Sequence, residues 1–239
     1  MPVYKSACIF KMKRTTAKQP YVDSAAHDAD SALFEKRGQA PRYSRSGSSM
    51  PVDMADIDAA VAVLRRGGII LYPTDTVWGI GCDATDDDAV RRVYALKRRD
   101  DHKALITLVS DFAMLERTVD GIPEVAYDLI EFADRPTTIV YDRGVGVSSL
   151  LMGDDGTLGV RVTSEPFSQA LVRRLGRPLV STSANISGEP TPRLYNEIAQ
   201  QVIDAVDYVC LSRRDETKTA APSVVMRLSA SGRFVVLRK

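Results

Sequence analysis

Hydrophobic and polar residues alternate with two different periods after Met50, as expected for helices interleaved with strands. Between residues 57 and 64 the apolar residues recur at the i, i+3, i+4 and i+7 positions of an amphipathic helix. Asp56 stands before this run as a candidate N-cap, and Gly67-Gly68 follows it as a terminator. The pattern therefore predicts a first helix that begins near Asp56.

The remaining periodic segments extend this alternation to the end of the chain. Helical spacing predicts further helices over residues 87–97, 123–133, 166–175 and 193–206. Short apolar runs predict strands over residues 69–72, 104–109, 137–141, 158–162 and 178–182, and three more at 208–211, 223–228 and 234–237. Alternation that gives way to a strand-rich end predicts an α/β (α+β) fold, a twisted mixed sheet with helices on its faces and ligands at the strand ends.

The first fifty residues differ from the rest of the chain in periodicity and charge. They show neither period and end in a Ser/Arg/Gly-rich stretch over residues 43–49. They carry nine Lys and Arg against four Asp and Glu, whereas the rest of the chain carries 23 against 27. We expect residues 1–50 to be a disordered basic tail and residues 51–239 to form one domain. The tail could be an RNA-contacting arm, an organellar presequence, or an extension upstream of a start at Met50.

Composition narrows the class of protein. The 239 residues are 44% hydrophobic and 26% charged, which is ordinary for a globular protein. No apolar run reaches the roughly 18 residues of a membrane helix, and the N-terminus has charges where a signal peptide has its apolar stretch. We therefore expect a cytoplasmic protein without a membrane partner. The three cysteines, Cys8, Cys82 and Cys210, are expected to be small buried residues.

The motifs that are missing limit the possible chemistry. The chain has neither the Gly-rich dinucleotide fingerprint nor a Walker-type phosphate loop. His27 and His102 are its only histidines, so neither a Ser-His-Asp triad nor a His-rich metal site is expected. Any reaction must therefore depend on hydroxyl, amide, Lys and Arg side chains.

Such side chains gather in three segments. Residues 72–81 read YPTDTVWGIG, a strand followed by a loop with hydroxyls, an Asp and the single Trp. Residues 97–103 read KRRDDHK, which could clamp a polyphosphate or could be a solvated charge run at a helix end. Residues 178–188 read PLVSTSANISG, a strand that delivers hydroxyls and an amide into a loop, or an ordinary polar turn.

Taken in order, PTDTVWGIGCDA, KRRDDHK, GVRV, STSANISGEP and APSVV resemble the YrdC-like family, the threonylcarbamoyl-adenylate synthases. The resemblance implies a concave, positively lined groove on the sheet and a reaction of ATP, bicarbonate and L-threonine, with Mg²⁺, that forms threonylcarbamoyl-AMP and pyrophosphate. It also implies downstream threonylcarbamoyl-transfer proteins as partners, and tRNA as the final acceptor.

The resemblance assigns roles to individual residues. The catalytic group would be Lys97, Arg99, Ser183 and Asn185. ATP would be bound by Arg99, Lys103, Thr157, Ser183, Thr191 and Arg238, and threonine by Thr76, Arg161, Ser181 and Ser223. No residue is assigned to a metal. The motifs fit a chemistry of positioning and charge stabilisation that needs no side-chain nucleophile.

Three departures from the family pattern leave alternatives open. The segment 133–138 lacks the usual Gly, Glu165 stands where many members have His, and Leu108 replaces a His found in some. The chain could therefore be a YciO-like RNA-binding or ribosome-associated paralogue with weak or no synthase activity. It could also adenylate the carbamate of another amine.

Overall fold

The computed structural model describes residues 52–98 and 105–238. The predicted tail over residues 1–50 and the predicted site residues Arg99 and Lys103 lie outside these ranges.

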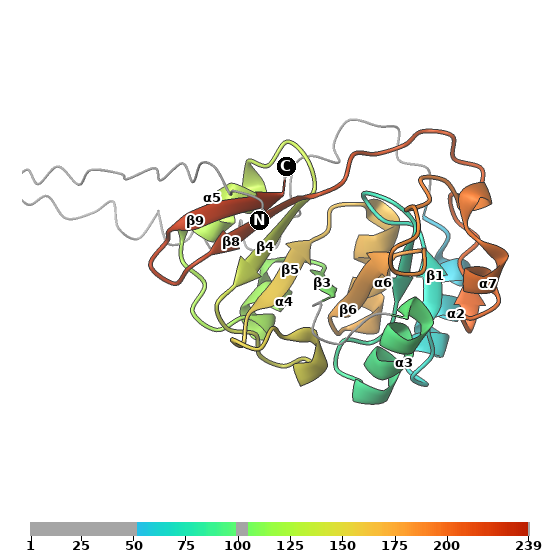
Figure 1. Ribbon diagram of the computed structural model, residues 1–239, viewed down its shortest axis with the longest axis horizontal. Helices are drawn as coiled ribbons and strands as arrows, with labels where there is room; N and C mark the ends of the chain where they lie inside the picture. The colour runs from blue at the N-terminus through green and yellow to red at the C-terminus, as the bar shows by residue number, and fades with distance from the viewer. Residues whose placement is uncertain (1–51, 99–104, 239) are drawn as a thin grey trace, which may run out of the picture.

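A nine-stranded sheet runs through the whole domain in the order β7-β1-β2-β6-β3-β5-β4-β8-β9 (Figure 1). Its strands are β1 (Ile70–Tyr72), β2 (Gly79–Gly81), β3 (Ile106–Val109), β4 (Thr137–Tyr141), β5 (Leu158–Val162), β6 (Leu179–Ser183), β7 (Tyr208–Val209), β8 (Val224–Leu228) and β9 (Phe234–Arg238). The pairs β1–β7, β3–β5 and β4–β8 are parallel and the others antiparallel. The predicted mixed sheet is confirmed.

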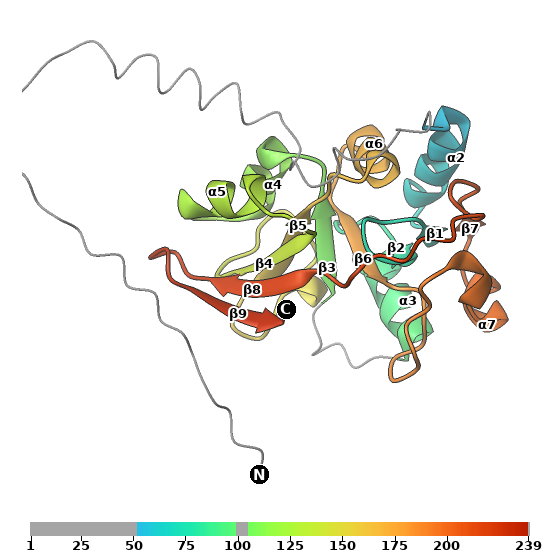
Figure 2. The same cartoon turned by 90° about the horizontal axis from the view of Figure 1, so that it is seen from above.

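Helices cover both faces of this sheet. They are α2 (Met54–Leu64), α3 (Asp87–Lys97), α4 (Phe112–Thr118), α5 (Val125–Glu131), α6 (Pro166–Leu175) and α7 (Gln200–Ile203), with 3₁₀ turns η2 (Ser149–Leu151) and η3 (Tyr195–Glu197). Figure 2 shows α2, α4, α5 and α6 on one side of the sheet and α3 and α7 on the other. The predicted layered architecture is therefore present.

Two expectations about helices are wrong. The N-cap of α2 is Asp53, whose carboxylate accepts hydrogen bonds from Ala55 N and Asp56 N, while Asp56 is buried one turn later. The predicted helix over residues 193–206 is replaced by η3 and α7, which are separated by extended residues. The Glu197 carboxylate accepts from the backbone N–H of Arg193 and closes a turn there, and the chain then extends to bury Ile198.

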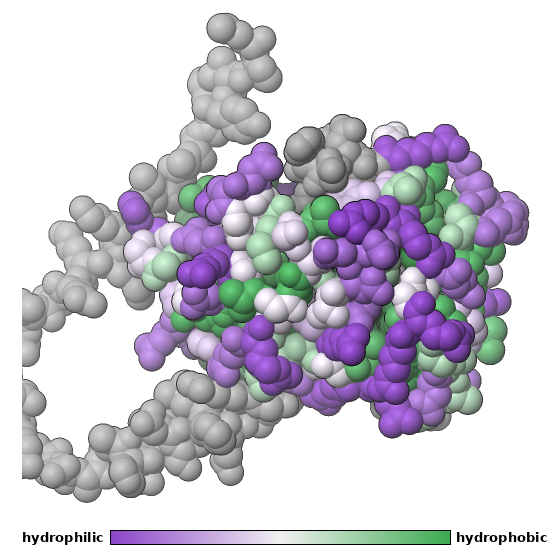
Figure 3. Space-filling view, turned by 90° about the horizontal axis from the view of Figure 1, so that it is seen from below, coloured by the Kyte–Doolittle hydropathy of each residue, from purple (hydrophilic) through white to green (hydrophobic). Residues whose placement is uncertain are grey.

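The hydrophobic core lies between the sheet and its helices. Cys82 and Cys210 are fully buried in it, as predicted, and burial raises the pKa of both thiols. Hydrophilic side chains cover most of the face seen in Figure 3, with smaller hydrophobic patches between them. Among the described residues, no helix has the length and apolar content needed to cross a bilayer.

The ring of Tyr72 lies over two glycines of the neighbouring strand. Tyr72 pairs with Gly79, and Gly81 lies two residues further along β2 on the same face. A Cβ atom at Gly81 would stand 2.7 Å from Tyr72 Cε1 and 2.7 Å from the Val180 carbonyl oxygen. The glycines thus create the space that the tyrosine ring fills.

The β8–β9 hairpin ends the chain with a register shift. A β-bulge between Val225 and Met226 sets Arg238 opposite Val225. The turn that connects the strands is closed by backbone hydrogen bonds from Ser229 to Arg233 and from Gly232 to Ser229. The hairpin thereby fixes which residue of β9 lies beside the start of β8.

Replacing Gly81 with Ala should destabilise the domain, because the Val180 carbonyl cannot withdraw without moving β6. We expect a loss of about 1–3 kcal/mol in the free energy of unfolding, the usual cost of overpacking a core. Gly159→Ala on β5 is the matched control, since its Cβ would meet nothing closer than 3.9 Å. Urea unfolding measures both variants, and equal midpoints for the two would contradict the packing described for Tyr72.

Candidate functional site

The register of the sheet gathers the predicted polar residues on one face. Residues that pair directly share a face, as do alternate residues of one strand. Ser183 pairs with Gly79, which pairs with Tyr72, so Ser181 and Ser183 lie on the face of the Tyr72 ring. The pairs Ile106–Ser181 and Leu108–Arg161 extend this face to Arg161. Tyr72, whose phenol pKa is raised by burial, lies beside Ser181 on this face.

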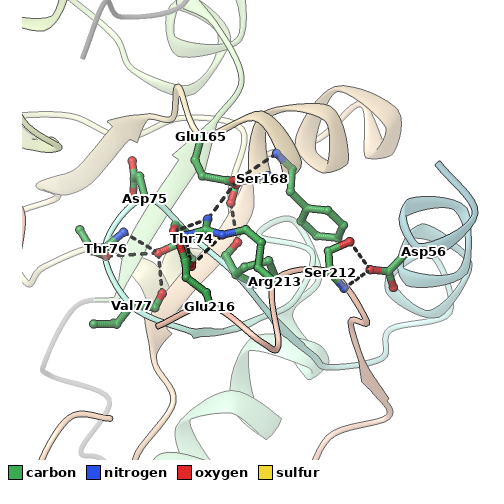
Figure 4. A network of polar contacts seen from close by, with 12 residues as sticks. Asp56, Thr74, Asp75, Thr76, Val77, Glu165, Ser168, Ser212, Arg213 and Glu216 are labelled. Carbon is green, nitrogen blue, oxygen red and sulfur yellow. Dashed lines mark hydrogen bonds and ion pairs between the residues drawn. The ribbon is translucent and has the colours of Figure 1, made fainter. Parts of the chain in front are cut away.

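The loop between β1 and β2 is held by its own hydroxyl groups. Thr74 Oγ1 donates to the Val77 carbonyl over 2.6 Å and accepts from the Thr76 backbone N–H over 3.1 Å (Figure 4). The hydroxyl groups of Thr74 and Thr76 are 3.2 Å apart. This internal bonding places Thr76, a predicted threonine contact, at a defined point beside the sheet.

Arg161 on β5 forms a buried ion pair with Asp75 of the β1–β2 loop. Its Nη2 atom lies 3.1 Å from Asp75 Oδ1, and both side chains are 4% exposed. The buried Nε of Arg161 has no hydrogen-bond acceptor among the described residues. A buried guanidinium with an unsatisfied donor is suited to an additional carboxylate. No role for Asp75 was predicted from the sequence, although an Asp between two Thr was a visible signal.

Lys97 is buried at the end of α3 and holds the loop that follows β6. Its ammonium donates to the carbonyl oxygens of Ser183 and Asn185, each over 2.5 Å, and to Asn185 Oδ1 over 3.3 Å. Ser183 Oγ donates to the same Asn185 Oδ1 over 2.5 Å. Three of the four predicted catalytic residues therefore form one cluster. In this structure Lys97 positions the other two.

Ser223 and Arg238 lie together at the other end of the face. Arg238 Nη2 donates to Ser223 Oγ over 3.0 Å, and Thr138 Oγ1 donates to the same hydroxyl over 3.3 Å. The register also sets Thr138 beside Arg161, because Ile139 pairs with Val160. The structure thus joins Arg238, predicted for ATP, to Ser223, predicted for threonine.

The two other predicted ATP contacts lie on loops. Thr157 precedes β5, and its hydroxyl donates to Asp155 Oδ1 over 2.6 Å, which together with Arg227 holds the pKa of that carboxyl below its usual value. Thr191 is exposed on the loop between β6 and η3. The structure does not bring Thr191 into the hydrogen-bonded cluster around Lys97.

Glu165 lies next to the β1–β2 loop. It is the N-cap of α6, and its carboxylate accepts from the backbone N–H groups of Phe167 and Ser168. Burial raises its pKa, against the opposing effects of Arg213 and these N–H groups. Glu165, which stands where many family members have His, therefore serves here as the cap of α6.

Comparison with known proteins gives a consistent result. Residues 62–239 match the model of the Sua5/YciO/YrdC family, whose description is "Telomere recombination". The threonylcarbamoyl-AMP synthase of Idiomarina loihiensis is 37% identical over 159 residues, which cover 65% of this chain and 86% of that protein. The enzyme of the same name from Chromohalobacter salexigens is 44% identical over 133 residues, 55% of this chain and 71% of that one.

Solved structures share the fold. The P. abyssi Sua5 complexed with L-threonine superposes with a TM-score of 0.69 at 29% identity, over 75% of this chain. This chain spans about half of that Sua5, since the match covers 52% of it. E. coli YciO superposes with a TM-score of 0.67 at 28% identity, over 78% of this chain and 90% of that one.

Removing the ammonium of Lys97 should unfold the loop after β6 and weaken the domain. In Lys97→Met the buried carbonyls of Ser183 and Asn185 lose their donor, so we expect the free energy of unfolding to fall by about 2–4 kcal/mol. Arg91→Met, on the same helix but in an exposed pair with Asp88, should change it by less than about 0.5 kcal/mol. Denaturant titration compares them, and similar effects would show that Lys97 has no such role.

Proposed function

The chain belongs to the Sua5/YciO/YrdC family, and from this premise we propose that it is a threonylcarbamoyl-AMP synthase. It would join L-threonine, bicarbonate and ATP into threonylcarbamoyl-AMP and release pyrophosphate. The observation that carries the proposal is the buried Arg161, whose Nε donor has no acceptor among the described residues. It lies beside Asp75 and Thr138 on the polar face of the sheet. It supports a subsite for the carboxylate of an amino acid.

The threonine subsite is proposed to lie between the β1–β2 loop and the start of β8. Arg161 would bind the carboxylate, and the hydroxyl groups of Thr76, Ser181 and Ser223 would contact the rest of the amino acid. Ser181 and Ser223 are buried, so their hydrogen bonds to a substrate would be little weakened by water. An amino acid held here would have a fixed orientation before the reaction begins.

The nucleotide is proposed to bind at the Lys97 cluster. Ser183 and Asn185 would face ATP, with Arg99, Lys103, Thr157 and Thr191 around them and Arg238 at the boundary with the threonine subsite. Among residues 52–98 and 105–238, no three His, Cys, Asp or Glu side chains come together as a metal site. Mg²⁺ would enter with ATP, bound to the phosphate oxygens.

The chemistry needs positioning more than a nucleophile from the protein. The threonine amine combines with bicarbonate to give a carbamate and water, and a carbamate oxygen then attacks the α-phosphorus of ATP with departure of pyrophosphate. Cations that hold the two anions together lower the barrier by proximity and by charge stabilisation. We further propose that the product passes to downstream transfer proteins and to tRNA in the cytoplasm.

Pyrophosphate release tests the proposal directly. The purified full chain with ATP, Mg²⁺, bicarbonate and labelled L-threonine should release pyrophosphate only when threonine is present, and labelled threonylcarbamoyl-AMP should appear. A folded sample that binds RNA with steep salt dependence but releases no pyrophosphate would instead support the YciO-like alternative. Release that depends on serine or another amine rather than on threonine would reassign the substrate.

Arg161→Lys should weaken threonine use and leave ATP use nearly unchanged. Lysine keeps the charge opposite Asp75 but loses the planar fork that can hold two carboxylates, so we expect the KM for threonine to rise about tenfold or more. Arg227→Lys on β8 is the control, because Arg227 pairs with the exposed Asp142 and Asp155. Steady-state kinetics measures both variants, and the same KM for threonine in the two would contradict the assignment of Arg161 to the subsite.

A further inference from the structure

Arg213 connects three segments that are far apart in the sequence. Its Nη1 atom donates to the Thr74 carbonyl oxygen over 3.1 Å and lies 3.1 Å from Glu165 Oε1. Its Nε and Nη2 atoms donate to Glu216 Oε2 on its own segment. Figure 4 shows this guanidinium between the β1–β2 loop and the start of α6. It therefore contacts the loop that carries Thr76 without lying on that loop.

Glu165 gives the guanidinium a fixed counter-charge. Its carboxylate is bound by the backbone N–H groups of Phe167 and Ser168, over 3.2 and 2.6 Å, so it cannot turn away from α6. The same helix end holds the loop a second time, because Ser168 Oγ donates to the Pro73 carbonyl over 2.8 Å. Two successive carbonyls of the loop are thus held, that of Pro73 by Ser168 of α6 and that of Thr74 by Arg213, which pairs with the Glu165 cap of that helix.

The backbone at Arg213 is strained and firmly supported. Its φ is +60°, in the left-handed region that is unfavourable for a residue with a Cβ atom. The residues before it are fixed by Asp56, whose carboxylate accepts from Leu211 N, Ser212 N and Ser212 Oγ. Burial opposes the charge of Asp56, but these bonds and one from Tyr208 hold its pKa below the usual value. The backbone at Arg213 is thus held in a position from which its guanidinium reaches the Thr74 carbonyl.

The position of Thr74 affects the residues that are proposed to bind or orient the substrate. The Thr74 hydroxyl fixes Thr76, and the intervening Asp75 pairs with Arg161. A displacement of the Thr74 carbonyl would move Thr76 and Asp75 together. Arg161 would then lose the partner that orients it.

We propose that Arg213 and Glu165 are positioning residues for the threonine subsite and act by fixing the β1–β2 loop at Thr74. This inference rests on the proposed function, because it assigns the subsite to threonine. Neither residue touches the substrate in this proposal. Their effect should appear in threonine binding and leave ATP binding unchanged.

The test compares threonine and ATP binding in matched variants. Arg213→Met should raise the Kd for L-threonine, measured by calorimetry, about tenfold and leave the Kd for ATP within twofold, since one charge-assisted contact to the loop is lost. Arg213→Lys should be intermediate, and it serves as the variant if Arg213→Met does not fold. Arg92→Met is the control, because Arg92 likewise bonds a carbonyl, that of Gly67, and a carboxylate, that of Asp207, but away from the loop.

A double-mutant cycle then tests whether the two residues act as a unit. Glu165→Gln should weaken threonine binding less than Arg213→Met does, and the double variant should bind threonine no more weakly than Arg213→Met alone. Independent, additive losses would overturn the proposed unit. Unchanged threonine affinity in both Arg213 variants, or equal losses for threonine and ATP, would overturn the positioning role.

The same measurements distinguish a wrong synthase assignment from a wrong positioning role for Arg213. If the wild-type chain binds threonine but releases no pyrophosphate, the synthase assignment is wrong, and the affinities still decide the role of Arg213. If the wild-type chain does not bind threonine, both the function and this inference are overturned.

Discussion

The buried ammonium group of Lys97 can remain inside the domain only if polar atoms replace its lost water, and the chain meets this requirement with the loop after β6. Burying an unpartnered charge is costly enough that a group normally loses the charge instead. Here the carbonyl oxygens of Ser183 and Asn185 turn inward to the ammonium, so the loop is wrapped around the end of α3. The same rule applies to two further buried charges. Arg161 holds Asp75, and Asp56 holds the backbone at Leu211 and Ser212.

These contacts explain how segments without regular structure can form a defined site. The site loops have few backbone partners of their own, and a loop with few contacts ordinarily samples many conformations. The β1–β2 loop and the loop after β6 are each held by a buried cation that belongs to a strand or a helix, Arg161 of β5 and Lys97 of α3. The rigidity of the sheet is thereby extended to Thr76 and Asn185, which regular hydrogen bonding does not reach. Preorganisation of this kind is what a reaction that depends on juxtaposing two anions requires.

The sequence predicted those parts of the fold that depend on local pattern. The elements α6, β4 and β5 match the predicted ranges because each has an unambiguous period and clear boundaries. Strand β2 was read as loop, since Gly79 and Gly81 carry no apolar signal and make a strand only by pairing with β1 and β6. Asp56 was read as a cap because a local pattern cannot distinguish a carboxylate that faces the first turn from one that binds a segment 155 residues away. The motifs likewise singled out Thr76, Arg161, Ser183 and Asn185 as candidate site residues, whereas the contacts of Arg213 and Asp75 depend on tertiary packing.

The register of the β8–β9 hairpin limits how this protein can vary over evolution. Surface turns usually tolerate insertions and deletions, because they add little to the core. The turn at residues 229–233 is different, since Arg238 reaches Ser223 only while the bulge near Val225 keeps β9 in its present alignment. One residue gained or lost in that turn would rotate every β9 side chain to the opposite face of the sheet. A compensating change at the bulge would then be needed to restore the guanidinium to Ser223, so the lengths of the turn and of the bulge are expected to be inherited together.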